Sequence, residues 1–412
     1  MSPDLSKLSS QLNALAFFAD LHEDAVFEAF CKLIATASTT NTTDTHAKAS
    51  LQTRKECAAR FASLLYKAHT DNWTDYLDEL VLGSTKTLAW FAAKDREIPF
   101  AMETVCRTEL EILQNAAEIL PGDLGMEEVY WLAHKSDLEN QYADRMDNLA
   151  KYGSGVFAKS SMFRLADETV LRLIPVANGD PVTFDVLYGY EDQHQRIIDN
   201  TKALLSGLPC SNLLLYGDAG TGKSASIKAV LNLFKNEGLR LVEVGRGQLA
   251  LLPDLLDCLA DEPSRFVVYI DDLSFGENDD SFSALKAVLE GGVCARSKNV
   301  VIYATSNRRH LVKESMSART GDDMHKRDTL QETLSLSQRF GECIFFEKPN
   351  NDAFMELVDS LASEYGLHPE SMEQLHIDAS SYALAQGGRS ARAARQFIEH
   401  LVAREGLNDV KS

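Results

Sequence analysis

The residues between positions 217 and 224 have the types and spacing needed to bind phosphate. They read GDAGTGKS and fit the pattern G-x-x-x-x-G-K-[ST]. Glycine lets backbone N–H groups wrap a polyphosphate, Lys223 supplies a cation for the outer phosphates, and the Ser224 hydroxyl can ligate Mg²⁺. An apolar run at 212–216 precedes the segment and a helix-like run at 225–234 follows it, as this motif requires. We therefore interpret the segment as a phosphate-binding P-loop rather than an empty glycine-rich turn; its members are Gly217, Asp218, Ala219, Gly220, Thr221, Gly222, Lys223 and Ser224.

Two carboxylates end another apolar run, FVVYIDD at 266–272. A buried strand ending here would deliver Asp271 beside the P-loop, where a carboxylate holds Mg²⁺, usually through its water shell. Asp272 would then face the outer phosphate as a candidate base or as the group that orients an attacking water. The competing interpretation is a helix N-cap or a surface pair, because aspartate also suits strand ends and helix starts.

A neutral amide ends a further strand-like run, VVIYATSN at 300–307. The Asn307 side chain both donates and accepts hydrogen bonds, so it can hold a water beside the phosphates. Asparagine at a strand end is otherwise usually a turn residue. Its position after the strand that follows the acidic pair favours the functional interpretation.

The elements that must position these groups alternate between strand and helix. Strands are expected at 212–216, 240–244, 266–270, 300–305 and 343–346, with helices between them. This alternation predicts an α/β fold with a parallel sheet flanked by helices, whose strand carboxyl ends share one edge. The segment before the first core strand holds Tyr188, Gly189 and Tyr190, which we expect either to lie over a nucleotide base or to be buried.

The remainder of the chain is predicted to be largely helical. Apolar spacing indicates helices up to about residue 153, with the tryptophans at 73, 90 and 131 in their core. A short hairpin is expected at 163–176, followed by the Asn-Gly-Asp-Pro breaker at 178–181. We predict a helical N-terminal domain at 1–180, a nucleotide-binding core at 181–348 and a helical lid at 349–412.

Composition narrows the classes of partner. The chain has 412 residues and a formal net charge of −20, which argues against nonspecific binding to nucleic acid or an anionic membrane. Seven scattered cysteines include no C-x-x-C pair, and no stretch resembles a targeting signal or a membrane span of about 20 apolar residues. From these features we expect a reduced, soluble, cytoplasmic protein.

Taken together, the motifs give the chain a resemblance to the AAA+ ATPases over residues 188–401. The signal is the series NLLLYGDAGTGKS, GLRLVEV, FVVYIDDLSF, LKAVLEGG, VVIYATSNRRHL, LSLSQRFG and GGRSARAARQFIEHL. Within that class it is similar to a bacterial ATP-binding family known as a domain of unknown function. The resemblance implies ATP and Mg²⁺ as ligands, Walker A at 217–224, Walker B at Asp271 and Asp272, and sensor 1 at Asn307.

The resemblance also implies two roles for arginine. Arg339 in SQRFG resembles an arginine finger that reaches the nucleotide of a neighbouring subunit, which would make the protein a homo-oligomer. Arg389 or Arg392 resembles sensor 2, projecting from a lid that spans 352–402. A fixed cationic fork suits both places because it neutralises charge on the transferred phosphoryl group.

One departure from the AAA+ pattern affects the expected rate. Many members carry Asp-Glu at Walker B, whereas this chain has Asp271-Asp272, so we expect slow hydrolysis and a stable ATP-bound state.

The leading hypothesis is an ATPase whose conformational switching remodels a protein client; the alternative is a nucleotide-gated adaptor or loader with negligible hydrolysis. The segment 308–333 is the most basic part of the chain and could contact nucleic acid or an acidic partner, or be a solvated loop. A GTPase is disfavoured because no N-K-x-D motif follows the P-loop.

Overall fold

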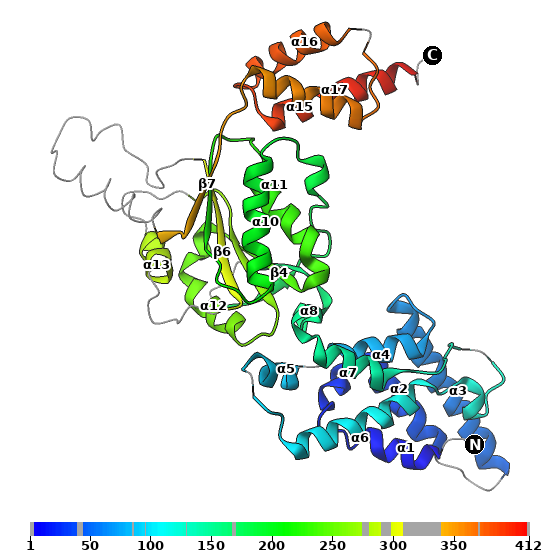
Figure 1. Cartoon of the computed structure of the whole chain (residues 1–412). Coiled ribbons are helices and arrows are strands. Elements are labelled where there is room, and N and C mark those ends of the chain that lie inside the picture. The colour runs from blue at the N-terminus through cyan, green and yellow to red at the C-terminus, as the bar shows by residue number, and fades with distance from the viewer. Residues whose placement is uncertain are drawn as a thin grey trace. The chain divides into compact units, whose positions relative to one another are not determined.

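The chain folds as two compact units, Met1–Lys159 and Ser160–Ser412. Figure 1 shows a helical first unit, and a second unit that consists of a sheet flanked by helices and a C-terminal helical bundle. No helix in the described part of the chain is long and apolar enough to cross a membrane. The computed structural model describes residues 4–38, 44–84, 86–94, 96–128, 130–166, 170–273, 280–289, 298–307, 339–369 and 371–409.

The first unit is a helical assembly around an aromatic core. Trp73 packs on Phe30 and Phe61 with ring centroids 4.4 and 5.0 Å away, and Phe61 in turn packs on Trp131 at 5.0 Å. Trp73 and Trp131 are therefore core residues, as predicted. The prediction for Trp90 is wrong, since 39% of its surface is exposed. The helices described in this unit are α1 (Leu5–Leu12), η1 (Ala19–Glu23), α2 (Ala25–Ser38), α3 (Asp44–Lys67), α4 (Trp73–Gly83), α5 (Lys86–Ala93), α6 (Phe100–Ala117), η2 (Pro121–Leu124), α7 (Leu138–Asp147), α8 (Leu149–Tyr152) and α9 (Val156–Lys159).

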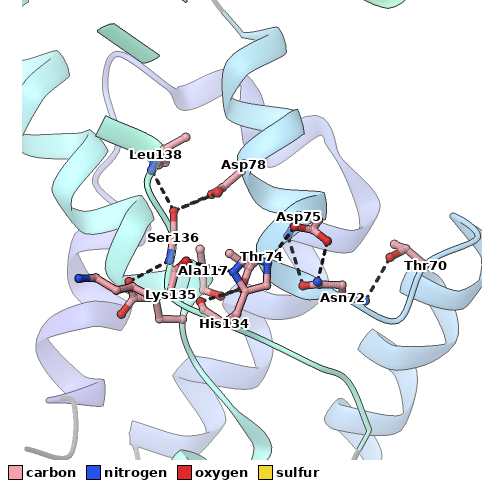
Figure 2. A network of polar contacts seen from close by, with 11 residues as sticks. Thr70, Asn72, Thr74, Asp75, Asp78, Ala117, His134, Lys135, Ser136 and Leu138 are labelled. Atoms are coloured by element: carbon pink, nitrogen blue, oxygen red, sulfur yellow. Dashed lines mark hydrogen bonds and ion pairs between the residues drawn. The ribbon is translucent and has the colours of Figure 1, made fainter. Parts of the chain in front are cut away.

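A polar network ties α4 to the segment that leads into α7 (Figure 2). The Ser136 hydroxyl lies 3.0 Å from both carboxylate oxygens of Asp78 and accepts the Leu138 N–H at 3.1 Å. Thr74 accepts the backbone N–H of His134 at 2.9 Å, and its own hydroxyl donates to the Ala117 carbonyl at 2.8 Å. Asp78 is buried, and that burial raises the pKa of its carboxyl to about 6.

The second unit is built on a sheet whose seven described strands have the order β2-β1-β4-β5-β6-β3-β7. Neighbouring strands are parallel except for the antiparallel pair β1 and β2. The central strands are rich in buried apolar residues because helices cover both of their faces. The strands are β1 (Met162–Leu165), β2 (Leu173–Pro175), β3 (Leu213–Gly217), β4 (Leu239–Val244), β5 (Arg265–Ile270), β6 (Val300–Ser306) and β7 (Glu342–Phe346).

The predicted hairpin belongs to this sheet rather than to the helical domain. β1 pairs in parallel with β4, with Met162 opposite Leu241, so the hairpin extends the sheet at one edge. The two compact units accordingly divide between Lys159 and Ser160, whereas the sequence suggested a boundary at 180. The pairing partner lies about 80 residues further along the chain, and local sequence patterns carry no sign of such a contact.

Helices lie on both sides of the sheet (Figure 1). α10 (Glu191–Leu205) and α11 (Lys223–Phe234) share one hydrophobic core with the strands, in which Ile197 and Ile227 pack with Leu213 and Leu215. α12 (Leu252–Ala260) and α13 (Asp280–Leu289) pack on each other, and α12 contacts β6. The connections include the short turns η3 (Phe184–Val186), η4 (Lys235–Glu237) and η5 (Arg246–Leu251).

The C-terminal helices form a bundle with its own core. α15 (Asn351–Glu364), α16 (Met372–Ala385) and α17 (Ala391–Asp409) enclose Phe354, Val358, Ala379, Ala394 and Ile398. Asn350 and Ser371 cap α15 and α16 by accepting backbone N–H groups of the first turn. This bundle corresponds to the predicted lid.

Candidate nucleotide-binding site

The P-loop joins the carboxyl end of β3 to the amino end of α11. Gly217, Gly220 and Gly222 have φ values of 139°, 80° and 92°, a region that favours glycine. A side chain at Gly217 is also excluded by packing, because an added Cβ would lie 2.1 Å from the carbonyl oxygen of Phe346. The sequence pattern thus predicted both the position of this loop and the need for its glycines.

The Lys223 side chain is folded against the loop. Its ammonium donates to the carbonyls of Gly217 at 2.9 Å and Asp218 at 2.6 Å. Lys223 is buried, and burial lowers the pKa of its ammonium. A nucleotide would offer this buried cation phosphate oxygens in exchange for the two carbonyls, and the opposite charge would offset the cost of burying it.

A second cluster of oxygen atoms lies beside the loop. The Asp271 carboxylate follows β5 and accepts hydrogen bonds from the Ser224 hydroxyl at 2.7 Å and the Thr305 hydroxyl at 2.6 Å. Desolvation acts to raise the pKa of Asp271, but these hydrogen bonds outweigh it and hold the pKa below its ordinary value. A low-pKa carboxylate touching a hydroxyl is the donor set that a hard cation such as Mg²⁺ prefers. The residues present therefore fit the expected metal.

Thr305 was missed by the sequence reasoning although it connects both acidic residues. It lies on β6, which stands between β5 and the P-loop strand β3. Its hydroxyl oxygen donates to Asp271 and accepts the backbone N–H of Asp272 at 2.9 Å. Asp272 has a φ of 48°, uncommon outside glycine, and its carboxylate accepts the Asn307 amide at 2.8 Å.

These groups line a cavity of about 460 Å³. Residues of η3, of the start of α10 and of the lid helices α15 and α17 line the same cavity. Of the predicted binding segment, Tyr188 and Tyr190 line the cavity, and Gly189 is not among its lining residues. The lining residues are Val186, Leu187, Tyr188, Tyr190, His194, Ala219, Gly220, Thr221, Gly222, Lys223, Ser224, Ala225, Asp271, Asp272, Thr305, Asn307, Leu357, Leu361, Ala391, Arg392 and Arg395.

Residues 158–405, which contain the whole cavity, match the model of a family described as "Protein of unknown function (DUF815)". The chain belongs to the DUF815 family. This match confirms the expected similarity to a family known as a domain of unknown function.

Solved structures with a similar fold share little sequence with this DUF815 chain. The RuvB Holliday junction branch migration motor of Thermotoga maritima is 16% identical, over 56% of this chain and 67% of that chain, with a TM-score of 0.36. A chain of the HORMA:CdnC:Trip13 complex of E. coli MS115-1 is 15% identical, over 53% of this chain and 90% of that chain, also with a TM-score of 0.36. No curated relative matches the sequence. Sequence identities of 15–16% do not transfer the functions of these proteins to this chain.

The lid of this DUF815 chain contacts the P-loop through the start of α17. The backbone N–H of Arg392 donates to the Gly220 carbonyl at 3.2 Å, and Ser390 lies close enough to Gly220 to crowd an added Cβ. Of the two lid arginines proposed from sequence, Arg392 lines the cavity and Arg389 does not. A third, Arg395, also lines it and donates to the Val186 carbonyl at 2.8 Å. The sequence reasoning missed Arg395, which lies one turn beyond Arg392 on the same helix.

Arg339 is not among the residues that line the cavity. It precedes β7, which runs parallel to β3, whereas the P-loop follows the carboxyl end of β3. The five residues of β7 separate these two edges by about 16 Å. The segment 308–333, proposed as a basic contact surface, lies outside the described residues.

Proposed function

We propose that this chain binds Mg-ATP, hydrolyses it slowly, and uses the resulting switch between its sheet and lid to remodel a protein client. In this proposal Lys223 and the loop N–H groups hold the phosphates, while Ser224 and Asp271 hold Mg²⁺. Asp272 and Asn307 orient the attacking water, and Arg392 neutralises charge on the transferred phosphoryl group.

The observation that carries the proposal is the convergence of these groups on one cavity. A buried ammonium, a hydroxyl-carboxylate pair and a lid arginine come from separate parts of the chain and line the same space. The hydrogen bond from the Ser224 hydroxyl to Asp271 spans 47 residues of sequence. A glycine-rich turn without a ligand would have no need for this arrangement.

Slow turnover is supported by the geometry of Asp272. Its side chain is one methylene shorter than the glutamate found in many AAA+ proteins, and Asn307 already binds it. The shorter side chain brings its carboxylate less far toward a water beside the outer phosphate, while Asn307 fixes its orientation. The ATP-bound state would then persist long enough to act as a signal.

Self-association is supported by the position of Arg339. Because Arg339 lies at the edge of the sheet away from its own P-loop, we infer that it serves the site of a neighbouring copy. Light scattering with and without ATP tests this inference: assembly in ATP that Arg339→Ala weakens is expected, and a monomer under every condition would remove the role.

Binding is tested first, by titrating a fluorescent ATP analogue into the wild type and Lys223→Ala. We expect Lys223→Ala to abolish binding, because the loop then loses its phosphate-facing cation. Lys228→Ala is a matched control, since its ammonium lies on the same helix and pairs at 3.5 Å with Asp180 rather than with the loop. Unchanged affinity in Lys223→Ala would sink the assignment.

The alternative is a nucleotide-gated adaptor in which hydrolysis is negligible, and the short side chain of Asp272 also favours it. The rate of phosphate release distinguishes the ATPase from the adaptor. If the protein is an ATPase, substitution of Asp272 or Arg339 lowers the release rate. If it is an adaptor, that rate stays at background while capture of the client changes.

A further inference from the structure

Tyr269 is a buried tyrosine on β5, two residues before Asp271. None of its surface is exposed, and its ring packs in the hydrophobic core that the sheet shares with α10 and α11. Ser224 belongs to the first turn of α11 and donates to Asp271 from there. Tyr269 therefore lies on the face of the sheet where α11 meets Asp271, next to the pair expected to hold Mg²⁺.

The Tyr269 hydroxyl approaches both members of this pair but has no hydrogen-bond partner of its own. It lies close to Ser224 and to Asp271. Among the residues that the structure describes, however, none meets the hydroxyl at hydrogen-bonding distance and angle. The Ser224 and Thr305 hydroxyls instead donate to one oxygen of Asp271, Oδ1, at 2.7 and 2.6 Å. Buried polar atoms nearly always have a partner, so this exception requires an explanation.

The neighbouring strand provides a direct comparison. Tyr303 lies on β6 opposite Tyr269, is also fully buried and packs in the same core. Its hydroxyl accepts from the Asn200 amide at 3.0 Å and lies 2.8 Å from the Thr201 hydroxyl, so it has two partners. A buried hydroxyl without a partner costs free energy that a phenylalanine ring would avoid. The tyrosine at 269 is explained if its hydroxyl gains partners in another state of the site.

Ser224 needs a hydrogen-bond acceptor when its oxygen ligates a cation. A phenolic hydroxyl can accept one hydrogen bond and donate another. Because the Tyr269 hydroxyl lies close to the serine and the carboxylate at once, it can accept from Ser224 and donate to Asp271. The buried hydroxyl would then have two partners, as Tyr303 has, and Asp271 Oδ1 would be released toward the water shell of the ion.

We propose that Tyr269 is a positioning residue for Mg²⁺, whose hydroxyl links Ser224 to Asp271 and fixes both around the ion. This inference rests on the proposed Mg-ATP function and adds to it a residue from the interior of β5. Tyr269 is not among the residues that line the cavity. Its contribution should therefore appear in the affinity that Mg²⁺ adds to ATP binding, and not in the binding of ATP without the metal.

The test compares ATP binding with and without the metal. Isothermal titration of the full chain with ATP is carried out in Mg²⁺ and in EDTA, for the wild type and for Tyr269→Phe. Loss of one hydrogen bond beside the ion predicts about tenfold weaker binding of ATP by Tyr269→Phe in Mg²⁺. Affinity in EDTA should be unchanged, because the groups that hold the phosphates are intact. The same affinity as the wild type in Mg²⁺ would overturn the inference, as would an equal loss in both buffers.

Tyr303→Phe is the matched control, and thermal melts of the metal-free protein separate the two tyrosines. Tyr303→Phe should melt below the wild type, because Asn200 and Thr201 lose a partner, but should keep the full gain in affinity from Mg²⁺. Tyr269→Phe should melt no lower than the wild type, because it removes a hydroxyl without a partner. A lower melting temperature for Tyr269→Phe would show that its hydroxyl is already satisfied without the metal and would overturn the inference.

A double-mutant cycle with Ser224→Ala tests whether Tyr269 acts through the serine. In the Ser224→Ala background, Tyr269→Phe should cost little further affinity in Mg²⁺, because the link to the ion is already broken. Additive losses would overturn the inference, and this comparison decides even if ATP binding in EDTA is too weak to measure. A wild type that binds ATP equally in Mg²⁺ and EDTA would overturn the role of Tyr269 alone, whereas a wild type that binds ATP in neither would remove the proposed function.

Discussion

The side-chain amide of Asn307 donates a 2.8 Å hydrogen bond to the carboxylate of Asp272. This contact joins the residues that follow two neighbouring strands, β5 and β6. Thr305 fixes the backbone of Asp272 at the same time, through a 2.9 Å bond from the N–H of Asp272 to the threonine hydroxyl. The acidic residue proposed to orient water is thus held from both its backbone and its side chain.

Substitution of Asn307 should impair turnover more than binding. In Asn307→Ala the Asp272 carboxylate loses its fixed position, so we expect phosphate release to fall about ten- to a hundredfold. ATP affinity should stay within about threefold, since the phosphate-holding groups are untouched. Single-turnover phosphate release and ATP titration measure the two effects. An equal loss of phosphate release and of ATP affinity would mean that Asn307 maintains the structure of the whole pocket rather than the position of the attacking water.

The two lid arginines should differ in their effect on turnover. Arg392 lines the cavity and its backbone contacts Gly220, whereas Arg389 does not line it. We expect Arg392→Ala to lower phosphate release about tenfold or more, because a cation beside the transferred group is lost. Arg389→Ala, the matched control, should stay within about twofold of the wild type. The reverse order would assign the sensor role to Arg389.

Alanine substitutions at two glycines of the P-loop should differ in their effects on thermal stability and on ATP binding. At Gly217 the new Cβ would meet the Phe346 carbonyl at 2.1 Å, so Gly217→Ala should lower the melting temperature of the protein without ligand. At Gly222 no atom lies within 4 Å of an added Cβ, and its φ of 92° leaves a strain of about 1–2 kcal/mol. Gly222→Ala should therefore lower the melting temperature less than Gly217→Ala does, but it should bind ATP more weakly, because the methyl group obstructs the phosphates. Circular dichroism melts and calorimetric titration measure both; equal melting temperatures for the two variants would contradict this account.

Asp78 should make the first unit less stable as pH rises. Its pKa is about 6 in the folded state against 3.8 ordinarily, so the folded chain binds the extra proton between these values. The free energy of unfolding consequently falls as pH rises from 3.8 to 6 and stays lowered above 6. Asp78→Asn should remove this loss and raise stability at pH 7.5 by about 1–3 kcal/mol, with no gain at pH 4.

Tryptophan fluorescence during urea unfolding can follow this effect in the full chain. All three tryptophans of the protein lie in the first unit, so their emission reports on that unit. Asp75→Asn is the control, because the Asp75 side chain is 65% exposed beside His134 and should change stability by less than about 0.5 kcal/mol. The same gain for Asp78→Asn at both pH values would show that packing rather than charge is responsible.

Local sequence determined the P-loop, the apolar strands and the helical lid. Glycines at fixed spacing, a strand before them and a helix after them are short-range features, and each is needed for the loop to bind phosphate. Asp271 and Asn307 could be placed for the same reason, since residues that follow parallel strands meet at one edge of a sheet. None of these inferences required knowing which strands are neighbours.

Tertiary structure decided which side chains complete the site. Thr305 reaches Asp271 because β6 stands next to β5, and Arg395 reaches Val186 across 209 residues of sequence. His194 lines the cavity because its helix packs against the end of β7 and the turn η3. Long-range strand pairing with β4 places β1 in the sheet. The packing of α17 against the P-loop decides that Arg392, and not Arg389, lines the cavity. Such contacts depend on how distant segments pack, and the period and composition of a single segment do not record them.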